Sequence, residues 1–229
     1  MSSLELTAAA ALFDMDGTLV DSNAVVEQIW REFCREHGVD EDVLVPWSHG
    51  RRTTDTVRHF LPDTPDDEVQ VIVDDLQERE QTTFTGVVEI PGARALLESI
   101  EIPWAVVTSA TRRLAVRRMR AVGLPVPEVL VPADEIERGK PHPDGYLTAC
   151  DLLGVDPREC IVFEDAAPGV RSALASGARV VVVGGLESPE ATDLPRVPDL
   201  TGVELRAPGR PEPRAPGRPG SSTPGSAGP

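Results

Sequence analysis

Residues 12–20, Leu-Phe-Asp-Met-Asp-Gly-Thr-Leu-Val, decide the fold of this chain and point to its chemistry. They overlap the end of an apolar run from Ala8 to Phe13, which predicts a buried strand. Asp14 and Asp16 then lie at the end of that strand, where ligands bind in open α/β sheets. A carboxylate in this place can act as a nucleophile, a metal ligand or a general acid. Taken alone, the segment also fits an ordinary turn, because Asp and Gly both favour turns.

Three later segments also place polar groups after apolar strands or in rigid loops. An apolar strand leads to Thr108 and Ser109 directly before an expected helix, whose free N–H groups favour an anion. Lys140 stands in Gly-Lys-Pro-His-Pro, where two prolines fix the backbone beside a cation. Another apolar strand leads to Glu164 and Asp165, hard oxygen ligands that suit Mg²⁺. Each segment alone also fits a helix cap, a surface lysine or acids at a helix start.

The remaining chain predicts an α/β fold, a Rossmann-like doubly wound parallel sheet with helices on both faces. The expected strands are 104–107, 129–131, 161–163 and 179–183, and the expected helices are 112–122, 146–153 and 170–176. Because the first strand precedes a helical block, we expect a core of residues 1–20 and 89–206 with an inserted small helical domain, 21–88. Within the insertion, helices are expected around 25–33, ending at Gly38, and around 69–76, with a loop at 46–53 before a further helix.

The carboxyl ends of parallel strands meet at one edge of a sheet, so the four segments are expected to converge. Acids for Mg²⁺, hydroxyls and a lysine for phosphate oxygens, and a spare carboxylate nucleophile together form a phosphoryl-transfer site. Each segment has a plainer explanation of its own, but no plain explanation covers all four.

These motifs resemble those of the haloacid dehalogenase superfamily, in the same order and over nearly the whole chain except its end. Asp-Met-Asp-Gly-Thr at 14–18 is similar to the first motif, and Glu-Asp at 164–165 with Pro-Gly at 168–169 is similar to the fourth. The helical insertion resembles the small helical cap of that superfamily. Four segments, 49–53, 104–109, 139–143 and 162–166, resemble the branch of 2-deoxyglucose-6-phosphate and glycerol phosphatases. The resemblance therefore implies an enzyme that hydrolyses small sugar or polyol phosphate monoesters.

The resemblance also implies which residues carry out the reaction. Asp14 would attack phosphorus and form an aspartyl-phosphate, while Asp16 would protonate the leaving alcohol and then activate water. Mg²⁺ would be held by Asp14, the main-chain oxygen of Asp16, and Asp165, with Glu164 binding directly or through water. The residues expected to hold the phosphoryl oxygens are Thr108, Ser109 and Lys140.

The cap loop is expected to select the substrate, because the core motifs contact only groups that all phosphate monoesters share. Trp47 is placed to stack on a sugar face, and His49 and Arg52 to bind hydroxyls or a second anionic group. The plainer alternative is that the arginines of this loop are solvated charges on an acidic protein.

Two other functions, a mutase and an inactive binding protein, stay open, whereas a dehalogenase is disfavoured. A β-phosphoglucomutase-like mutase would share the core, but in that family a cap histidine follows the second Asp by about ten residues, where Val26 stands here. A dehalogenase would lack an acid at Asp16. An inactive binding protein with the same fold would be expected to have lost one of the motif acids, and all are present.

Composition excludes several classes of partner. The formal net charge of −16 disfavours nucleic acid and anionic membranes, and no apolar run is long enough to span a bilayer. Three cysteines without metal-site spacing, and no recognisable signal peptide, favour a cytoplasmic protein, which we expect to be a monomer. The segment 207–229 is rich in Pro, Gly, Ser, Ala and Arg and predicts a disordered tail.

The expected helix at 112–122 is rich in basic residues. Arginines occupy positions 112, 113, 117, 118 and 120. Leu114, Val116 and Met119 are its expected core contacts, so we expect the arginines to form a solvated face rather than a binding patch.

Overall fold

Parallel strands in the order β6-β5-β2-β7-β8-β9 form the central sheet in the computed structural model, which describes residues 4–209. Most of the predicted tail, from residue 210 onward, therefore lies outside the described residues. The strands are β2 (Ala10–Phe13), β5 (Trp104–Val107), β6 (Val129–Val131), β7 (Cys160–Glu164), β8 (Arg179–Val183) and β9 (Arg196–Val197). Every residue of β2 and β7 is buried, as expected for strands covered on both faces. The predicted doubly wound parallel sheet is confirmed.

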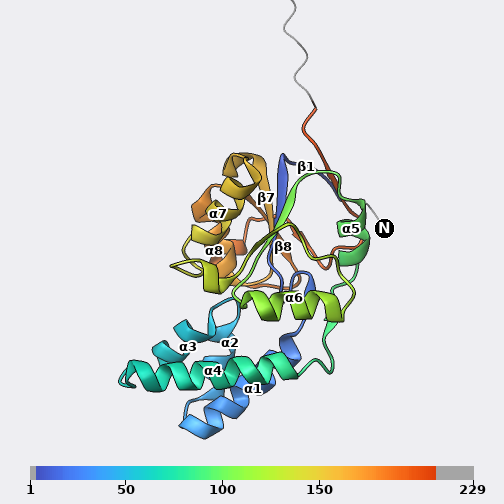
Figure 1. Cartoon of the computed structure of the whole chain (residues 1–229). Helices are drawn as coiled ribbons and strands as arrows, with labels where there is room; N and C mark the ends of the chain where they lie inside the picture. The colour runs from blue at the N-terminus through green and yellow to red at the C-terminus, as the bar shows by residue number, and fades with distance from the viewer. Residues whose placement is uncertain (1–3, 210–229) are drawn as a thin grey trace, which may run out of the picture.

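Helices on the two faces of the sheet bury alternate residues of the same strands. The four helices are α5 (Ala93–Ser99), α6 (Arg112–Ala121), α7 (Asp144–Leu153) and α8 (Ala167–Ser176). Phe13 and Phe163 pack with α5 and α6, whereas Leu12 and Val162 pack with α7 and α8 on the other face. Figure 1 shows α7 and α8 on one side of the sheet and α5 on the other. This two-residue alternation decides which face of the sheet each side chain packs on, up to the carboxyl ends of the strands. Short 3₁₀ turns occur at η1 (Ala133–Glu135), η2 (Pro157–Glu159) and η3 (Pro189–Ala191).

The inserted helices form a separate layer beyond the ends of the strands, below the sheet in Figure 1. They are α1 (Asn23–His37), α2 (Glu41–Ser48), α3 (Thr53–Phe60) and α4 (Asp66–Thr82). Their apolar faces build a core of their own around Ile29, Phe33 and Val73. Two short strands, β3 (Val20–Asp21) and β4 (Val88–Glu89), pair antiparallel where the chain leaves the sheet and returns to it.

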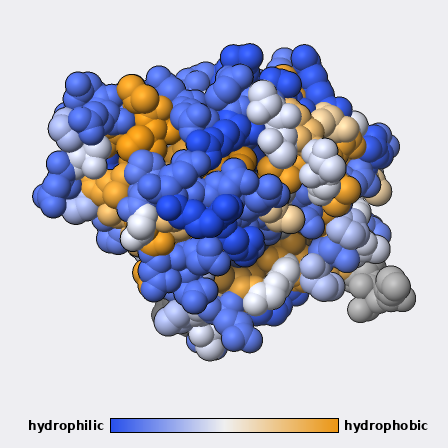
Figure 2. Space-filling model, turned by 90° about the horizontal axis from the view of Figure 1, so that it is seen from below, coloured by the Kyte–Doolittle hydropathy of each residue, from blue (hydrophilic) through white to orange (hydrophobic). Residues whose placement is uncertain are grey.

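The surface of this helical layer is mostly hydrophilic, with scattered apolar patches (Figure 2). That distribution is ordinary for a protein surface in water. Within residues 4–209, none of the helices combines the length and the apolarity that crossing a membrane requires.

The structure corrects two local expectations. The predicted loop at 46–53 is shorter, because α2 continues through Pro46 to Ser48 and only residues 49–52 link it to α3. Burial of Leu44 and Val45 against the neighbouring helices, with Asp40 capping the helix start, outweighs the cost of the internal proline. A parallel pair outside the main sheet, β1 (Leu4–Thr7) with β10 (Val203–Arg206), was not expected.

Candidate active site

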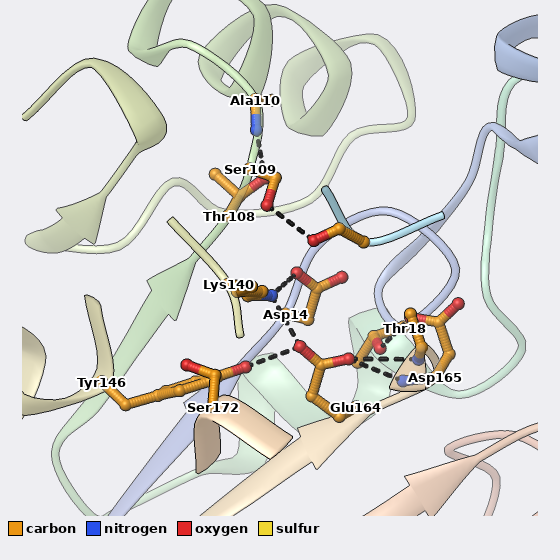
Figure 3. Close-up of polar contacts among 12 residues, drawn as sticks. Asp14, Thr18, Thr108, Ser109, Ala110, Lys140, Tyr146, Glu164, Asp165 and Ser172 are labelled. Carbon is orange, nitrogen blue, oxygen red and sulfur yellow. Dashed lines mark hydrogen bonds and ion pairs between the residues drawn. The ribbon is translucent and has the colours of Figure 1, made fainter. Parts of the chain in front are cut away.

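The ends of three neighbouring strands bring the predicted site residues together. Asp14 follows β2, Thr108 follows β5 and Glu164 ends β7, and these strands are adjacent in the order β5-β2-β7. The N–H of Asp14 donates to the main-chain oxygen of Phe163, which ties the first segment to the fourth. Figure 3 shows Lys140 reaching this edge of the sheet between Asp14 and Glu164.

The ammonium of Lys140 and three side chains close to it form what we call the inner cluster. Its four members, all buried, are Asp14, Lys140, Glu164 and Tyr146. Lys140 contacts Asp14 Oδ1 and lies 2.6 Å from Glu164 Oε1, which also accepts a 2.8 Å hydrogen bond from the Tyr146 hydroxyl. The other Glu164 oxygen accepts the N–H groups of Asp165 and Ala166 at 3.0 and 3.2 Å. Both Glu164 oxygens are therefore engaged, and this carboxylate aims the ammonium at Asp14.

The charges of the site call for a further cation. Asp14, Glu164 and Asp165 each offer an oxygen within 4.8 Å of the others, and among residues 4–209 only Lys140 places an ammonium between them. Burial raises the pKa of Asp14 to about 7 although Lys140 opposes the shift, and burial also raises the pKa of Asp165 well above its usual range. When all three carboxylates are ionised, the one ammonium leaves two negative charges, which a divalent cation with a preference for oxygen would balance. The residues present therefore fit a magnesium site.

Two glycines make room for these carboxylates. Gly17 has a φ of 87°, and a Cβ added there would overlap the Asp165 carboxylate. A Cβ on Gly169, in the first turn of α8, would overlap the Glu164 carboxylate. Asp165 also accepts a 3.1 Å hydrogen bond from Thr18, so the Gly-Thr pair of the first segment directly positions the fourth.

Thr108 and Ser109 line a small cavity of about 60 Å³ that also contains Asp14 and Asp16. Thr108 Oγ1 accepts the N–H of Ala110 at 3.0 Å, whereas Ser109 donates to the main-chain oxygen of Gly50 at 2.9 Å. The Thr108 hydroxyl thus stabilises the turn after β5, and the Ser109 hydroxyl links the core to the inserted segment (Figure 3).

Asp16 has a buried arginine as its partner, and this corrects an expectation from the sequence. Its Oδ1 accepts hydrogen bonds from Ser22 at 2.6 Å and from Arg118 Nη1 at 2.8 Å. Arg118 is only 2% exposed, so the prediction that all five arginines of this helix form a solvated face is wrong for this one. The pattern of five arginines in nine residues conceals the inward-facing position, although its neighbour Met119 is buried as expected.

We call the three residues expected to select the substrate the rim; they are Trp47, His49 and Arg52. The structure places each of them in a different environment. His49 lines both the small cavity and a larger cleft of about 720 Å³ beside it, with its Nε2 3.5 Å from Glu27 Oε1. Arg52 makes a two-point ion pair with Asp55 at 2.8 and 2.9 Å and donates to the main-chain oxygen of Glu137 at 3.1 Å.

Trp47 belongs to α2 and packs away from both cavities. Its ring stacks on His59 with centroids 4.3 Å apart, and the Arg51 guanidinium lies 4.0 Å from its ring centroid. Arg51 lines the small cavity, while Arg52 does not line it. Nothing in the sequence distinguishes Arg51 from its neighbour as a cavity residue. Tyr146 and Glu80 were not predicted either, since a lone tyrosine or glutamate on a helix carries no pattern.

Comparisons with known proteins place the chain in a family and among similar folds. Residues 8–177 match the family model described as haloacid dehalogenase-like hydrolase. The chain is 42% identical to hexitol phosphatase A of Escherichia coli K12 over 75% of this chain and 81% of that protein. It is 32% identical to 2-deoxyglucose-6-phosphate phosphatase 1 of Saccharomyces cerevisiae, over 77% and 80%. A hydrolase structure from Pseudomonas syringae superposes with a TM-score of 0.75 at 23% identity, covering 83% of this chain and 94% of that one.

Proposed function

The chain belongs to the haloacid dehalogenase-like hydrolase family, and from that premise we propose that it hydrolyses small sugar or polyol phosphate monoesters. The inner cluster is the single observation that carries the proposal. It sets a buried carboxylate, Asp14, against a fixed ammonium at the edge of the sheet, next to hydroxyls and further acids. The names of the similar phosphatases support sugar and polyol esters as the substrate class.

In the proposed reaction, Asp14 attacks phosphorus and the bond from phosphorus to the leaving oxygen breaks. Asp16 gives its proton to that oxygen, which leaves as an alcohol, and an aspartyl-phosphate stays on Asp14. Asp16 then accepts a proton from water as the water oxygen attacks phosphorus, the bond from phosphorus to the Asp14 oxygen breaks, and inorganic phosphate leaves with the Asp14 carboxylate restored. Lys140 and Thr108 would hold the phosphoryl oxygens through their side chains, and Ser109 through its main-chain N–H, because its hydroxyl proton is donated to Gly50.

We assign Mg²⁺ to Asp14, Asp165 and the main-chain oxygen of Asp16. When bound, the ion supplies positive charge that offsets repulsion between the Asp14 carboxylate and an anionic phosphate. Glu164 would contact it through water, because both of its oxygens already accept hydrogen bonds.

The arrangement favours hydrolysis over phosphoryl transfer back to a sugar. Val26, which occupies the place of the histidine expected in a mutase, lines the small cavity. An apolar side chain there cannot move a proton. Water is therefore the proposed acceptor of the phosphoryl group.

We also place the protein in the cytoplasm. Cys34, Cys150 and Cys160 are free and buried in the structure. Free thiols persist in a reducing compartment, which supports this assignment.

Phosphate release from a panel of monoesters tests the proposal. The panel comprises a hexitol phosphate, 2-deoxyglucose-6-phosphate, glycerol-1-phosphate and p-nitrophenyl phosphate, each with Mg²⁺ or with excess EDTA. We expect turnover of at least one sugar or polyol ester, loss of that turnover in EDTA and recovery on adding Mg²⁺. No release from any ester would overturn the function, and full activity in EDTA would overturn the metal assignment.

A further inference from the structure

Arg118 lies between the acid Asp16 of the core and Glu80 of the inserted helix α4. Its Nη1 is 2.8 Å from Asp16 Oδ1, and its Nη2 is 4.0 Å from Glu80 Oε1. All three side chains line the small cavity that holds Asp14. Helices α4 and α6, which carry Glu80 and Arg118, contact each other across the boundary between the two layers (Figure 1).

A purely structural explanation accounts poorly for this arginine. Arg118 Nε and Nη2 are buried and find no hydrogen-bond partner within residues 4–209. Burial also raises the pKa of Glu80 to about 7, although Arg118 opposes the shift. Burying such charges costs more free energy than an apolar side chain of similar size would. A group kept at that cost beside a proposed catalytic acid is better explained by function.

The hydrogen bonds to Asp16 indicate the role of Arg118. Ser22 and Arg118 both donate to Oδ1, so two donors fix the rotation of the carboxylate. Oδ2 stays available to carry the proton that the leaving group needs. Without the guanidinium, Ser22 alone would hold the carboxylate and the direction of proton transfer would be less defined.

We propose that Arg118 is the positioning residue of Asp16 and that Glu80 holds its guanidinium from the cap side. Asp16 is then fully oriented as a general acid only when α4 lies against α6. This inference rests on the proposed function, because it assigns a task within that reaction.

The leaving group separates positioning from other roles. An alkoxide is a strong base and must receive the Asp16 proton as its bond to phosphorus breaks, whereas p-nitrophenolate leaves without one. The ratio kcat/KM reports the steps up to the first irreversible bond cleavage, so it isolates this half of the reaction. A defect in positioning must then depend on the leaving group.

The test compares Arg118→Met, Arg118→Lys and the control Arg120→Met, an exposed arginine on the same helix. Values of kcat/KM are measured with sorbitol-6-phosphate and with p-nitrophenyl phosphate. We expect Arg118→Met to lose about 10²-fold on the sugar alcohol ester but less than about threefold on the aryl ester. Arg118→Lys should recover part of the loss, and Arg120→Met should match the wild type.

Glu80→Gln keeps the size of its side chain and tests the cap side. We expect a loss of about 3- to 10-fold on the alkyl ester alone, and no additional loss when Arg118→Met is already present. An additive loss would overturn the role of Glu80.

The outcomes separate this inference from the function on which it rests. Equal losses on the two esters, or no loss on either, would overturn positioning by Arg118 while the proposed function stands. A wild-type protein that releases phosphate from no ester of the panel would overturn the function and this inference with it.

Discussion

The inner cluster and the rim handle charge in opposite ways. In the inner cluster, Lys140 is 5% exposed and Glu164 is fully buried, and both contact charged partners directly. In the rim, the side chains of His49 and Arg52 are 32% and 22% exposed, and their contacts with Glu27 and Asp55 meet water. Electrostatic effects are strong and geometrically fixed in the first region and screened in the second. Substitutions in the inner cluster should therefore lower activity equally on every substrate. Substitutions in the rim should have small effects that differ between substrates.

The largest expected effect is that of Asp14→Asn. An amide is not a competent nucleophile, so turnover should fall by at least about 10⁴-fold on every ester that the wild type hydrolyses. The protein should stay folded, because the change removes a buried charge. Phosphate release and thermal unfolding by circular dichroism check both statements. Retention of even a tenth of the rate would mean that another residue is the nucleophile.

Lys140→Met should cost about 3–5 kcal/mol of unfolding free energy, because it leaves buried carboxylates without their ammonium. Urea unfolding in EDTA measures this, with Arg138→Met as the control. Arg138 is 59% exposed and pairs with Asp144 at the surface, so its loss should lower the unfolding free energy far less than the loss of Lys140. Similar costs for the two variants would erase the distinction between buried and exposed pairs.

The unfolding free energy of the metal-free protein should fall as pH rises from about 5 to 8. Burial raises the pKa of Asp14 from 3.8 to about 7 in the folded state. The folded protein then binds the proton more tightly, and this stabilisation is lost as pH rises through the raised value. We expect Asp14→Asn to flatten the profile by about 1–3 kcal/mol, measured by urea unfolding in EDTA. A wild-type profile as flat as that of the variant would contradict the shift.

The smallest effects are expected in the rim. Replacing His49 or Arg52 by Ala should lower kcat/KM by about 3- to 10-fold, by different factors for different sugar phosphates and less for p-nitrophenyl phosphate. Trp47→Ala should act mainly on stability, since its ring packs on His59. Equal losses across all substrates would place the rim residues in catalysis or folding instead.

Sequence alone predicted the sheet and the acids at its edge, because those residues follow strands whose apolar runs are unambiguous. Asp14, Glu164 and Asp165 were identified in this way and Lys140 from the two prolines that follow it, and the structure brings all four together. What the sequence could not predict depends on tertiary contacts. Arg118 resembles its solvated neighbours until packing turns it inward, and β1 pairs with a strand about 200 residues away.

The position of Trp47 shows the same limit at a finer level. A proline and polar neighbours are typical of a loop, yet the burial of Leu44 and Val45 keeps this stretch helical. The helix turns the indole toward His59 instead of toward the cleft. Local propensity is a weak guide wherever neighbouring elements decide which face is buried.

The antiparallel pairing of β3 with β4 has a consequence for how such a protein can diversify. The chain leaves the sheet through β3 and returns through β4, and these paired strands lie about 5 Å apart. The fold of the core therefore does not depend on the length of the inserted segment between them. One contiguous stretch of gene can be exchanged, lengthened or grafted from a relative while Asp14 and Lys140 keep their places. New preferences can then arise by replacing a module, as long as the replacement keeps a partner for Arg118 in the place of Glu80.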